Sequence, residues 1–303
     1  MIFKDKTWSI LIPALLLAVW VGWSTSRPGT TVISAQARGY DWGALAKKVL
    51  PADGVVLLAS PTGGPARYGD IGPKLIKTGA IDLEKFKKVT NLNDDQLKIL
   101  TQGSSEQIVI NRENNHFLLN FFWALGLANK NTILDEGMMM KYGGRKGAGG
   151  FASTGGWTVG SRDAMQVYST ARIVELTPEQ QKIVEEVTNG VYRPCCDNPT
   201  SFPDCNHGMA ALGLAELLAS QGASADEIFA ALKAANSYWF AGQYVTLARY
   251  FEAKEGKKWQ DVPGRTVLGK AYSSYSGWTA VQNWLSENNL LPPPATGGGS
   301  CGV

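Results

Sequence analysis

The chain has 303 residues, of which 44% are hydrophobic and 18% charged, as suits a globular protein of one large or two modest domains. Its formal net charge at pH 7 is only +3, and lysine and arginine form no dense run, so nucleic acid is not an expected partner. Ten tryptophans and 34 glycines indicate aromatic packing among loops rather than a simple helix bundle.

Residues 1–26 are predicted to be a membrane anchor. Lys4 and Lys6 precede an uncharged apolar stretch, residues 8–23, that begins and ends with tryptophan, as membrane–water interfaces favour. The lysines predict that the N-terminus is cytoplasmic and that the body lies on the extracytoplasmic side of the cell membrane, with a single membrane pass. A cleaved signal peptide is the alternative, because residues 35–37 read Ala-Gln-Ala, which resembles a cleavage site. In both cases the body is exported.

Three further segments are predicted after the anchor. Residues 27–70 are predicted to be a linker with a short irregular segment, and residues 71–289 a helical extracytoplasmic domain. Residues 290–303 contain three prolines and a Gly-Gly-Gly-Ser run, which is typical of a disordered tail. The fold class is therefore expected to be mainly α, with long Gly-rich and Cys/Pro-rich loops.

Capping residues and apolar periodicity place the helices of this domain. The pairs Asn93/Gln96, Thr177/Gln180 and Ser224/Glu227 each have the spacing of a capping box. Helices are expected over residues 82–89, 94–100, 113–129, 178–189, 206–220, 225–240, 243–253 and 278–288.

The helix over residues 113–129 is the first long one, and it is apolar on almost all sides from Phe117 onward. It is too short to cross a bilayer, so we expect it to be buried against the equally apolar helix over residues 206–220. Glu113, His116 and Asn120 share one face of it, and polar groups on a buried helix need partners.

The segment over residues 142–160 contains eight glycines. Its Gly147-x-Gly149 pattern lacks the preceding strand and the lysine position of a phosphate-binding loop, so nucleotide binding is not predicted. The segment is interpreted as a mobile surface loop, with a lid as one option.

Residues 193–209 concentrate the chemistry of the chain. They hold three of its four cysteines, one of its two histidines and three prolines. Asp204 is the expected N-cap of the helix that follows, which would put Cys205 at the positive end of the helix dipole and lower the pKa of its thiol. His207 and Met209 would then project from the same end of this helix.

Three interpretations of this cluster are open. In the first, a disulfide joins Cys196, or alternatively Cys195, to Cys205, and the chain is a structural or interaction protein without a metal. In the second, copper or zinc is bound by soft ligands, with His116 as a distant further ligand and with Glu113 and Asp204 as residues that orient the ligands. The predicted ligands are Cys195, Cys196, Cys205, His207 and Met209.

The third interpretation is a Cys-His enzyme, with Cys205 as nucleophile, His116 as base and Asn120 or Glu113 orienting the base. A redox-active disulfide between Cys195 and Cys196 is a variant of this third interpretation.

The function predicted first is a membrane-anchored extracytoplasmic helical module whose Cys/His cluster binds copper or zinc or has a redox-related role.

Overall fold

The computed structural model describes residues 39–59 and 64–291, and most of this part of the chain is helical, as predicted. No helix within these described ranges is long and apolar enough to cross a membrane. The predicted anchor at residues 1–26 and residues 292–303 of the predicted tail lie outside them.

Short strands form two antiparallel pairs before the first long helix. Strand β1 (Val55–Val56) pairs with β4 (Val109–Ile110), and β2 (Arg67–Gly69) pairs with β3 (Ser104–Gln107). The helices that precede α6 are α2 (Trp42–Val49), α3 (Ile71–Thr78), α4 (Leu83–Thr90) and α5 (Asp94–Gln102). Those that follow are α6 (Asn115–Ala128), α7 (Thr132–Glu136), α8 (Met138–Lys141), α9 (Gly144–Ala148), α10 (Ala152–Gly155), α11 (Ala164–Val167), α12 (Pro178–Gly190), α13 (Asn206–Ser220), α14 (Ala225–Trp239), α15 (Ala241–Glu255), η1 (Trp259–Asp261), α16 (Gly264–Val267), α17 (Lys270–Ser273) and α18 (Tyr275–Glu287).

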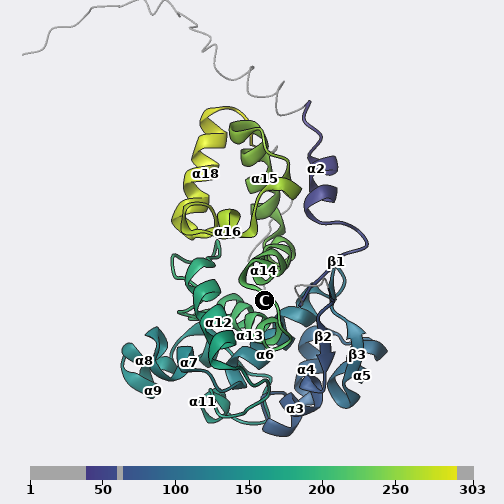
Figure 1. The fold of residues 1–303 in the computed structure, drawn as a ribbon, viewed down its shortest axis with the longest axis vertical. Helices are drawn as coiled ribbons and strands as arrows, with labels where there is room; N and C mark the ends of the chain where they lie inside the picture. Colours follow the sequence, from purple (N-terminus) through teal and green to yellow (C-terminus); the bar gives the residue numbers. More distant parts are fainter. Residues whose placement is uncertain (1–38, 60–63, 292–303) are drawn as a thin grey trace, which may run out of the picture.

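Helices α6 and α13 form the centre of the fold (Figure 1). Every residue of α6 from Phe117 onward is buried, and so is every residue of α13 over 208–219. The two backbones touch where Gly126 crosses Gly213: a Cβ built on Gly126 would lie 2.1 Å from the carbonyl oxygen of Met209. The sequence prediction that the two most apolar helices pack together is therefore confirmed.

The two central helices run in the same general direction. Near their C-terminal ends, Asn131 donates a hydrogen bond of 2.7 Å to Glu216. Near their N-terminal ends, the Trp239 indole donates to the carbonyl of Asn115 at 3.2 Å and lies 6.2 Å from the His207 ring, centroid to centroid. The start of α13, which carries the cysteine cluster, therefore lies at the end of the core where α6 also begins.

Helix α2 packs against α15 in the upper part of Figure 1, where α16 and α18 also lie. Tyr40, just before α2, donates a hydrogen bond to Glu252, and the Arg249 guanidinium lies 4.0 Å above the Tyr40 ring. The segment predicted as a linker, residues 27–70, thus carries α2, β1 and β2 in its described part.

All three predicted capping boxes are formed, at the starts of α5, α12 and α14. The first long helix begins two residues later than predicted, at Asn115. Asn111 accepts hydrogen bonds from the backbone N–H groups of Glu113 and Asn114, and Asn114 accepts one from the N–H of Asn111. These side-chain bonds fold the preceding residues into a turn that competes with helix formation.

The Gly-rich segment, predicted as a mobile surface loop, is partly exposed and partly buried. It contains α9 and α10, and buried hydrogen bonds hold it against the rest of the fold. The Trp123 indole donates to the Ser153 carbonyl at 2.7 Å, and the Trp157 indole donates to the Ala80 carbonyl at 2.8 Å. The Ser153 N–H donates to the carbonyl of Asp204 at 3.1 Å, so this segment contacts the start of α13 directly.

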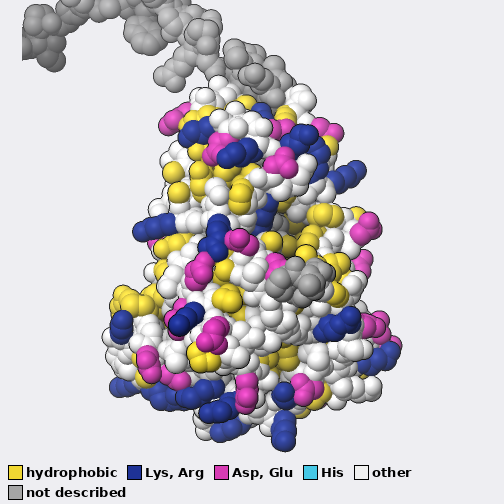
Figure 2. Space-filling view, in the orientation of Figure 1, with side chains coloured by type: hydrophobic (Ala, Val, Ile, Leu, Met, Phe, Trp, Pro, Cys, Tyr) yellow, Lys and Arg dark blue, Asp and Glu magenta, His cyan; other side chains and the backbone are white. Residues whose placement is uncertain are grey.

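The surface carries charges of both signs, as the small net charge implies. On the face shown in Figure 2, acidic and basic side chains are interspersed, with basic groups gathered along the lower edge.

Candidate metal centre

Cys205, rather than Asp204, is the N-cap of α13. Its Sγ accepts a hydrogen bond from the backbone N–H of Gly208 at 3.4 Å. Asp204 does not cap the helix because its carboxylate has other partners: Oδ1 lies 2.5 Å from Nη2 of Arg193, and Oδ2 accepts from the Asn198 amide at 2.7 Å. The cysteine therefore takes the position at which a side chain meets the free N–H groups of the first turn.

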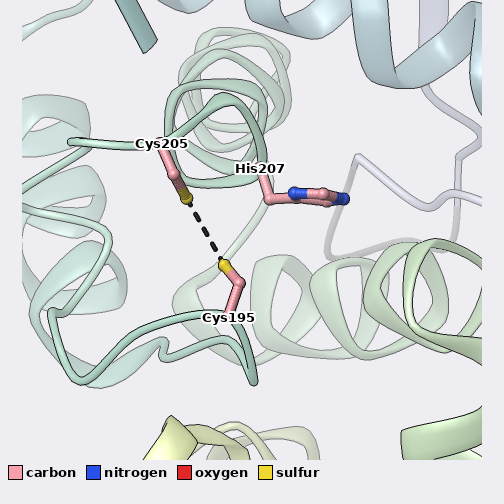
Figure 3. A group of neighbouring side chains, drawn as sticks. All are labelled: Cys195, Cys205 and His207. Carbon is pink, nitrogen blue, oxygen red and sulfur yellow. Dashed lines mark hydrogen bonds between the residues drawn. The ribbon is translucent and has the colours of Figure 1, made fainter. Parts of the chain in front are cut away.

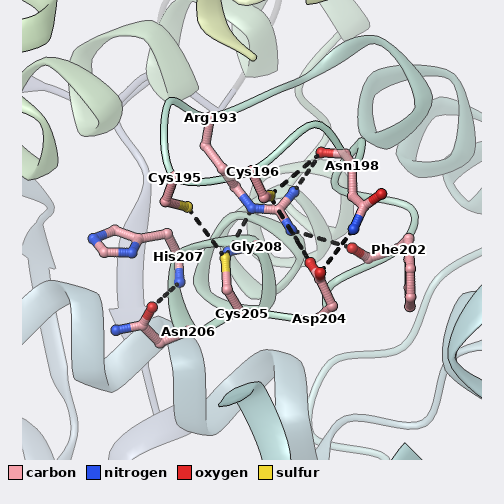
Figure 4. Close-up of polar contacts among 10 residues, drawn as sticks. All are labelled: Arg193, Cys195, Cys196, Asn198, Phe202, Asp204, Cys205, Asn206, His207 and Gly208. Atoms are coloured by element: carbon pink, nitrogen blue, oxygen red, sulfur yellow. Dashed lines mark hydrogen bonds and ion pairs between the residues drawn. The ribbon is translucent and has the colours of Figure 1, made fainter. Parts of the chain in front are cut away.

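Arg193 is the side chain around which the loop is folded, and only 1% of it is exposed. Its Nε donates to Cys205 Sγ at 2.9 Å, while Nη1 donates to the Asn198 carbonyl at 3.0 Å and Nη2 to the Phe202 carbonyl at 3.2 Å (Figure 4). Gly208 leaves the room for this, because a Cβ there would lie 2.6 Å from the guanidinium carbon. The guanidinium thus closes the loop onto the start of α13.

Sequence reasoning did not single out Arg193. A lone arginine beside a proline gives no sign of burial, since arginine is almost always exposed unless it is paired. Its burial could have been predicted only from the residues near it in the sequence. This one segment supplies a carboxylate, a thiol and two backbone carbonyls, which together can satisfy the hydrogen-bond donors of a guanidinium.

The cysteine loop brings two sulfurs face to face. Cys195 Sγ lies 3.5 Å from Cys205 Sγ, and Figure 3 shows the two side chains pointing toward each other from the loop and from α13. Ligand atoms of Cys195, Cys205 and His207 all lie within 4.8 Å of one another. A second group, formed by Cys196, Asp204 and Cys205, meets the same criterion and shares the Cys205 sulfur.

Aromatic rings hold the imidazole of His207 beside the sulfur pair. Its ring centroid lies 4.4 Å from that of Phe240 at an interplanar angle of 37°, and the Trp239 ring lies edge-on to it. In Figure 3 the ring extends to one side of the sulfurs, with one nitrogen nearer to them than the other. The ring is therefore packed on one face and presents that nearer nitrogen to the cluster.

The environment divides the three thiols into one acidic and two weakly acidic groups. Hydrogen bonds from the Cys195 and Cys196 thiols, together with the positive charge of Arg193, hold the pKa of Cys205 well below its ordinary value despite burial. Hydrogen bonding to the other two cysteines and burial raise the pKa of Cys195. Cys205 is therefore the most acidic of the three thiols, and Cys195 is less acidic than an ordinary cysteine.

The same charges act on the arginine. Burial alone would lower the pKa of Arg193, but the adjoining thiolate of Cys205 and the other two sulfurs raise it. The guanidinium is thus permanently charged, and its buried charge is compensated by Asp204 and by the Cys205 sulfur.

Met209, predicted as a further ligand, is fully buried in the core. Its carbonyl oxygen packs against Gly126 of α6. Side chains two residues apart on an α-helix differ in direction by about 200°, so the Met209 side chain projects from a different face of α13 than the His207 side chain does.

The structure does not bring His116 together with Cys205. Within the described residues, His116 belongs to neither group of converging ligand atoms, and burial lowers the pKa of its half-buried imidazole. The amide of Asn120 donates to the backbone carbonyl of His116 at 3.0 Å rather than to the ring. Glu113 is exposed in the turn before α6. Among the described residues, neither Asn120 nor Glu113 therefore orients the His116 ring through a hydrogen bond.

All three cysteines of the cluster are free, so the predicted Cys196–Cys205 disulfide is not formed. The Cys196 sulfur instead lies 3.9 Å from the carbonyl oxygen of Asn198 and 4.0 Å from Oδ1 of Asp204. The loop turns Cys196 toward these oxygens, and it is Cys195 that meets Cys205.

Comparison of the chain with protein-family models, with curated protein sequences and with solved structures found no match. The function is therefore argued from the geometry of the cluster.

Proposed function

We propose that the chain binds one thiophilic metal ion, Cu(I) or Zn²⁺, through Cys195, Cys205 and His207. The observation that carries the proposal is the convergence of the three ligand atoms within 4.8 Å of one another. Zinc bound to thiolates at about 2.3 Å in a tetrahedron requires sulfurs about 3.8 Å apart. The 3.5 Å between the Cys195 and Cys205 sulfurs is close to that spacing.

The alternative group of Cys196, Asp204 and Cys205 is less suited to a cation. Both carboxylate oxygens of Asp204 are already engaged, one by Arg193 and one by Asn198. A metal ion bound there would also face the guanidinium charge at short range, which costs binding energy. We therefore assign Asp204 to holding Arg193 in place.

The ligand chemistry favours a soft or borderline metal. Thiolate and imidazole are ligands of copper and zinc, whereas magnesium and calcium require oxygen. Arg193 serves as an outer hydrogen-bond donor to the Cys205 sulfur and offsets part of the charge of two thiolates. Cys195 is exposed, so an ion has access from solvent on that side of the cluster.

We further propose that the module acts outside the cytoplasm, tethered by residues 1–26. The support is the lysine-flanked, tryptophan-bordered apolar stretch of the sequence.

The test is a metal titration of the full chain, purified in reduced form without chelators and handled without oxygen. Zn²⁺ and Cu(I) are each titrated against a competing chelator, and Co²⁺ reports thiolate ligation through its absorption spectrum. We expect one equivalent to bind. Removing a ligand in Cys195→Ser, Cys205→Ser or His207→Ala should weaken binding by more than the roughly 10–100-fold that loss of an outer partner costs.

Two matched variants serve as controls. Cys196→Ser removes a neighbouring thiol, and His116→Ala removes the other histidine; both should bind metal as the wild-type chain does. Serine is itself a good N-cap residue, so Cys205→Ser should keep α13 folded. Equal retention of metal by Cys205→Ser and Cys196→Ser would refute the proposed ligand set.

A further inference from the structure

The sulfur pair of Cys195 and Cys205 has the arrangement of a dithiol as well as that of a metal ligand set. The two sulfurs are in contact at 3.5 Å, and the side chains of Cys195 and Cys205 point toward each other in Figure 3. The Cys196 sulfur also lies within 4.8 Å of the Cys205 sulfur, but it contacts the oxygens of Asn198 and Asp204 at 3.9 Å and 4.0 Å. The shorter sulfur–sulfur contact of 3.5 Å therefore favours the Cys195–Cys205 pair.

The two members of the pair differ in their surroundings. Cys205 Sγ accepts hydrogen bonds from Arg193 Nε at 2.9 Å and from the N–H of Gly208 at 3.4 Å, and both donors favour a negatively charged sulfur. Arg193 cannot turn away, because Asp204 and the carbonyls of the loop fix its other nitrogens. Cys195 lies opposite and is exposed, and among the described residues no cationic group donates a hydrogen bond to its sulfur.

We infer that Cys195 and Cys205 form a redox pair that undergoes thiol–disulfide exchange with small disulfides, with Cys205 as the attacking sulfur and Cys195 as the resolving one. The activity shares two sulfurs with the proposed metal site and does not require the metal.

The exchange has two balanced steps. In the first, the Cys205 thiolate attacks one sulfur of a low-molecular-weight disulfide; a Cys205–substrate disulfide forms, and the other half leaves as a thiolate. In the second, Cys195 gives its proton to the thiolate released first, its sulfur attacks the Cys205 sulfur, and the second half of the substrate leaves as a thiolate. Two electrons move from the protein to the substrate, which is reduced to one thiol and one thiolate.

The contact distance favours the second step. An intramolecular attack gains from having the two sulfurs already side by side. The product disulfide removes two of the three proposed metal ligands, so oxidation and metal binding should exclude each other.

The test uses the metal-free full chain with Cys301→Ser as background, because Cys301 lies outside the described residues. The protein is incubated with oxidised glutathione, quenched with an alkylating agent and mapped by mass spectrometry without reduction. We expect a Cys195–Cys205 disulfide in the background chain and in Cys196→Ser. In Cys195→Ser the reaction should stop at a glutathione adduct on Cys205.

Two further variants separate this inference from the metal proposal. His207→Ala should lose the metal and still form the disulfide, whereas Arg193→Lys, which keeps the charge but removes Nε, should slow adduct formation on Cys205 at least tenfold. A Cys195–Cys196 or Cys196–Cys205 bond as the main product would overturn the inference. So would an adduct that forms equally fast on Cys205→Ser and Cys195→Ser.

Discussion

Arg193 shows how one buried residue decides the chemistry of its neighbours. Its guanidinium makes four contacts with the loop and with the start of α13, and one of them is to the sulfur of Cys205. A buried ion pair of this kind adds little net stability compared with apolar packing, but removing one partner leaves the other uncompensated. The arginine therefore keeps the loop, the carboxylate of Asp204 and the thiolate in one arrangement.

Replacing this arginine with methionine, Arg193→Met, should lower the free energy of unfolding by about 3–5 kcal/mol, since Asp204 would be left largely buried without its counter-charge. Urea unfolding of the full chain, followed by circular dichroism, measures the change. Lys130→Met is the control, because the pair of Lys130 with Asp135 is at the surface and contributes about 1 kcal/mol or less. Equal losses in the two variants would show that burial of the guanidinium has no special role.

At the scale of elements, the site depends on how closely α13 lies against α6. Gly126 and Gly213 permit that approach, since a Cβ on Gly213 would lie 2.3 Å from the carbonyl oxygen of Phe122. Cys205 is carried at the start of α13, whereas Cys195 is on the loop, so the spacing of their sulfurs depends on where α13 sits.

Gly213→Ala and Gly126→Ala should each therefore lower the free energy of unfolding by about 1–3 kcal/mol, as overpacking of a well-packed core does. Both should also weaken metal binding, because α13 must move away from α6. Gly242→Ala is the matched control: this residue of α15 has no atom within 4 Å of a built Cβ, and alanine should leave stability unchanged or raise it by up to about 1 kcal/mol. Unchanged stability in Gly213→Ala would mean that the helices adjust without strain.

The helices themselves were predictable from the sequence because their signals are local. Capping boxes placed the starts of α5, α12 and α14, and the apolar runs identified α6 and α13 as the core pair. The span of α13 matches the predicted residues 206–220, but its N-cap was misassigned by one residue, since the carboxylate of Asp204 bonds to Arg193 rather than to the helix. The short helices α9 and α10 were missed as well, because the hydrogen bonds of Trp123 and Trp157 that join this segment to the rest of the fold link residues distant in the sequence.

The candidate site was predictable as a set of residues but not as an arrangement. Clustering of cysteine, histidine and methionine in a short segment pointed to Cys195, Cys196, Cys205, His207 and Met209, and the structure brings the ligand atoms of Cys195, Cys205 and His207 together. Which of two adjacent cysteines faces Cys205 depends on the direction of the loop, which Arg193 and the carbonyls of Asn198 and Phe202 determine. Such contacts produce no periodic pattern in the sequence from which they could be predicted.

At the scale of the whole molecule, a buried carboxyl group links α13, α12 and the segment after α6 at the end of the core opposite the cysteine cluster. Glu216 on α13 is fully buried and accepts a hydrogen bond of 2.7 Å from the Asn131 amide, while its Oε2 has no partner among the described residues. Asn131 in turn accepts from the Gln181 amide at 3.1 Å, so α12 and the segment after α6 are joined to α13 through this residue. Burial raises the pKa of Glu216 well above its ordinary value of 4.5, despite the hydrogen bond from Asn131.

The sign of the resulting pH dependence follows from proton counting. Above pH 4.5 the unfolded chain releases the Glu216 proton, whereas the folded chain keeps it up to its own higher pKa. The folded state binds more protons in that window, so the free energy of unfolding falls as pH rises, by up to about 1.4 kcal/mol per pH unit for one group.

Glu216→Gln cannot titrate and should lose this contribution to the pH dependence, while the other groups contribute equally to both proteins. Denaturant unfolding at pH 4, 5, 6 and 7 should then show the stability of the variant rising relative to wild type above pH 4.5, with a constant offset below it. Parallel curves over the whole range would mean that Glu216 is ionised in the folded protein and that an unrecognised cation or donor compensates it.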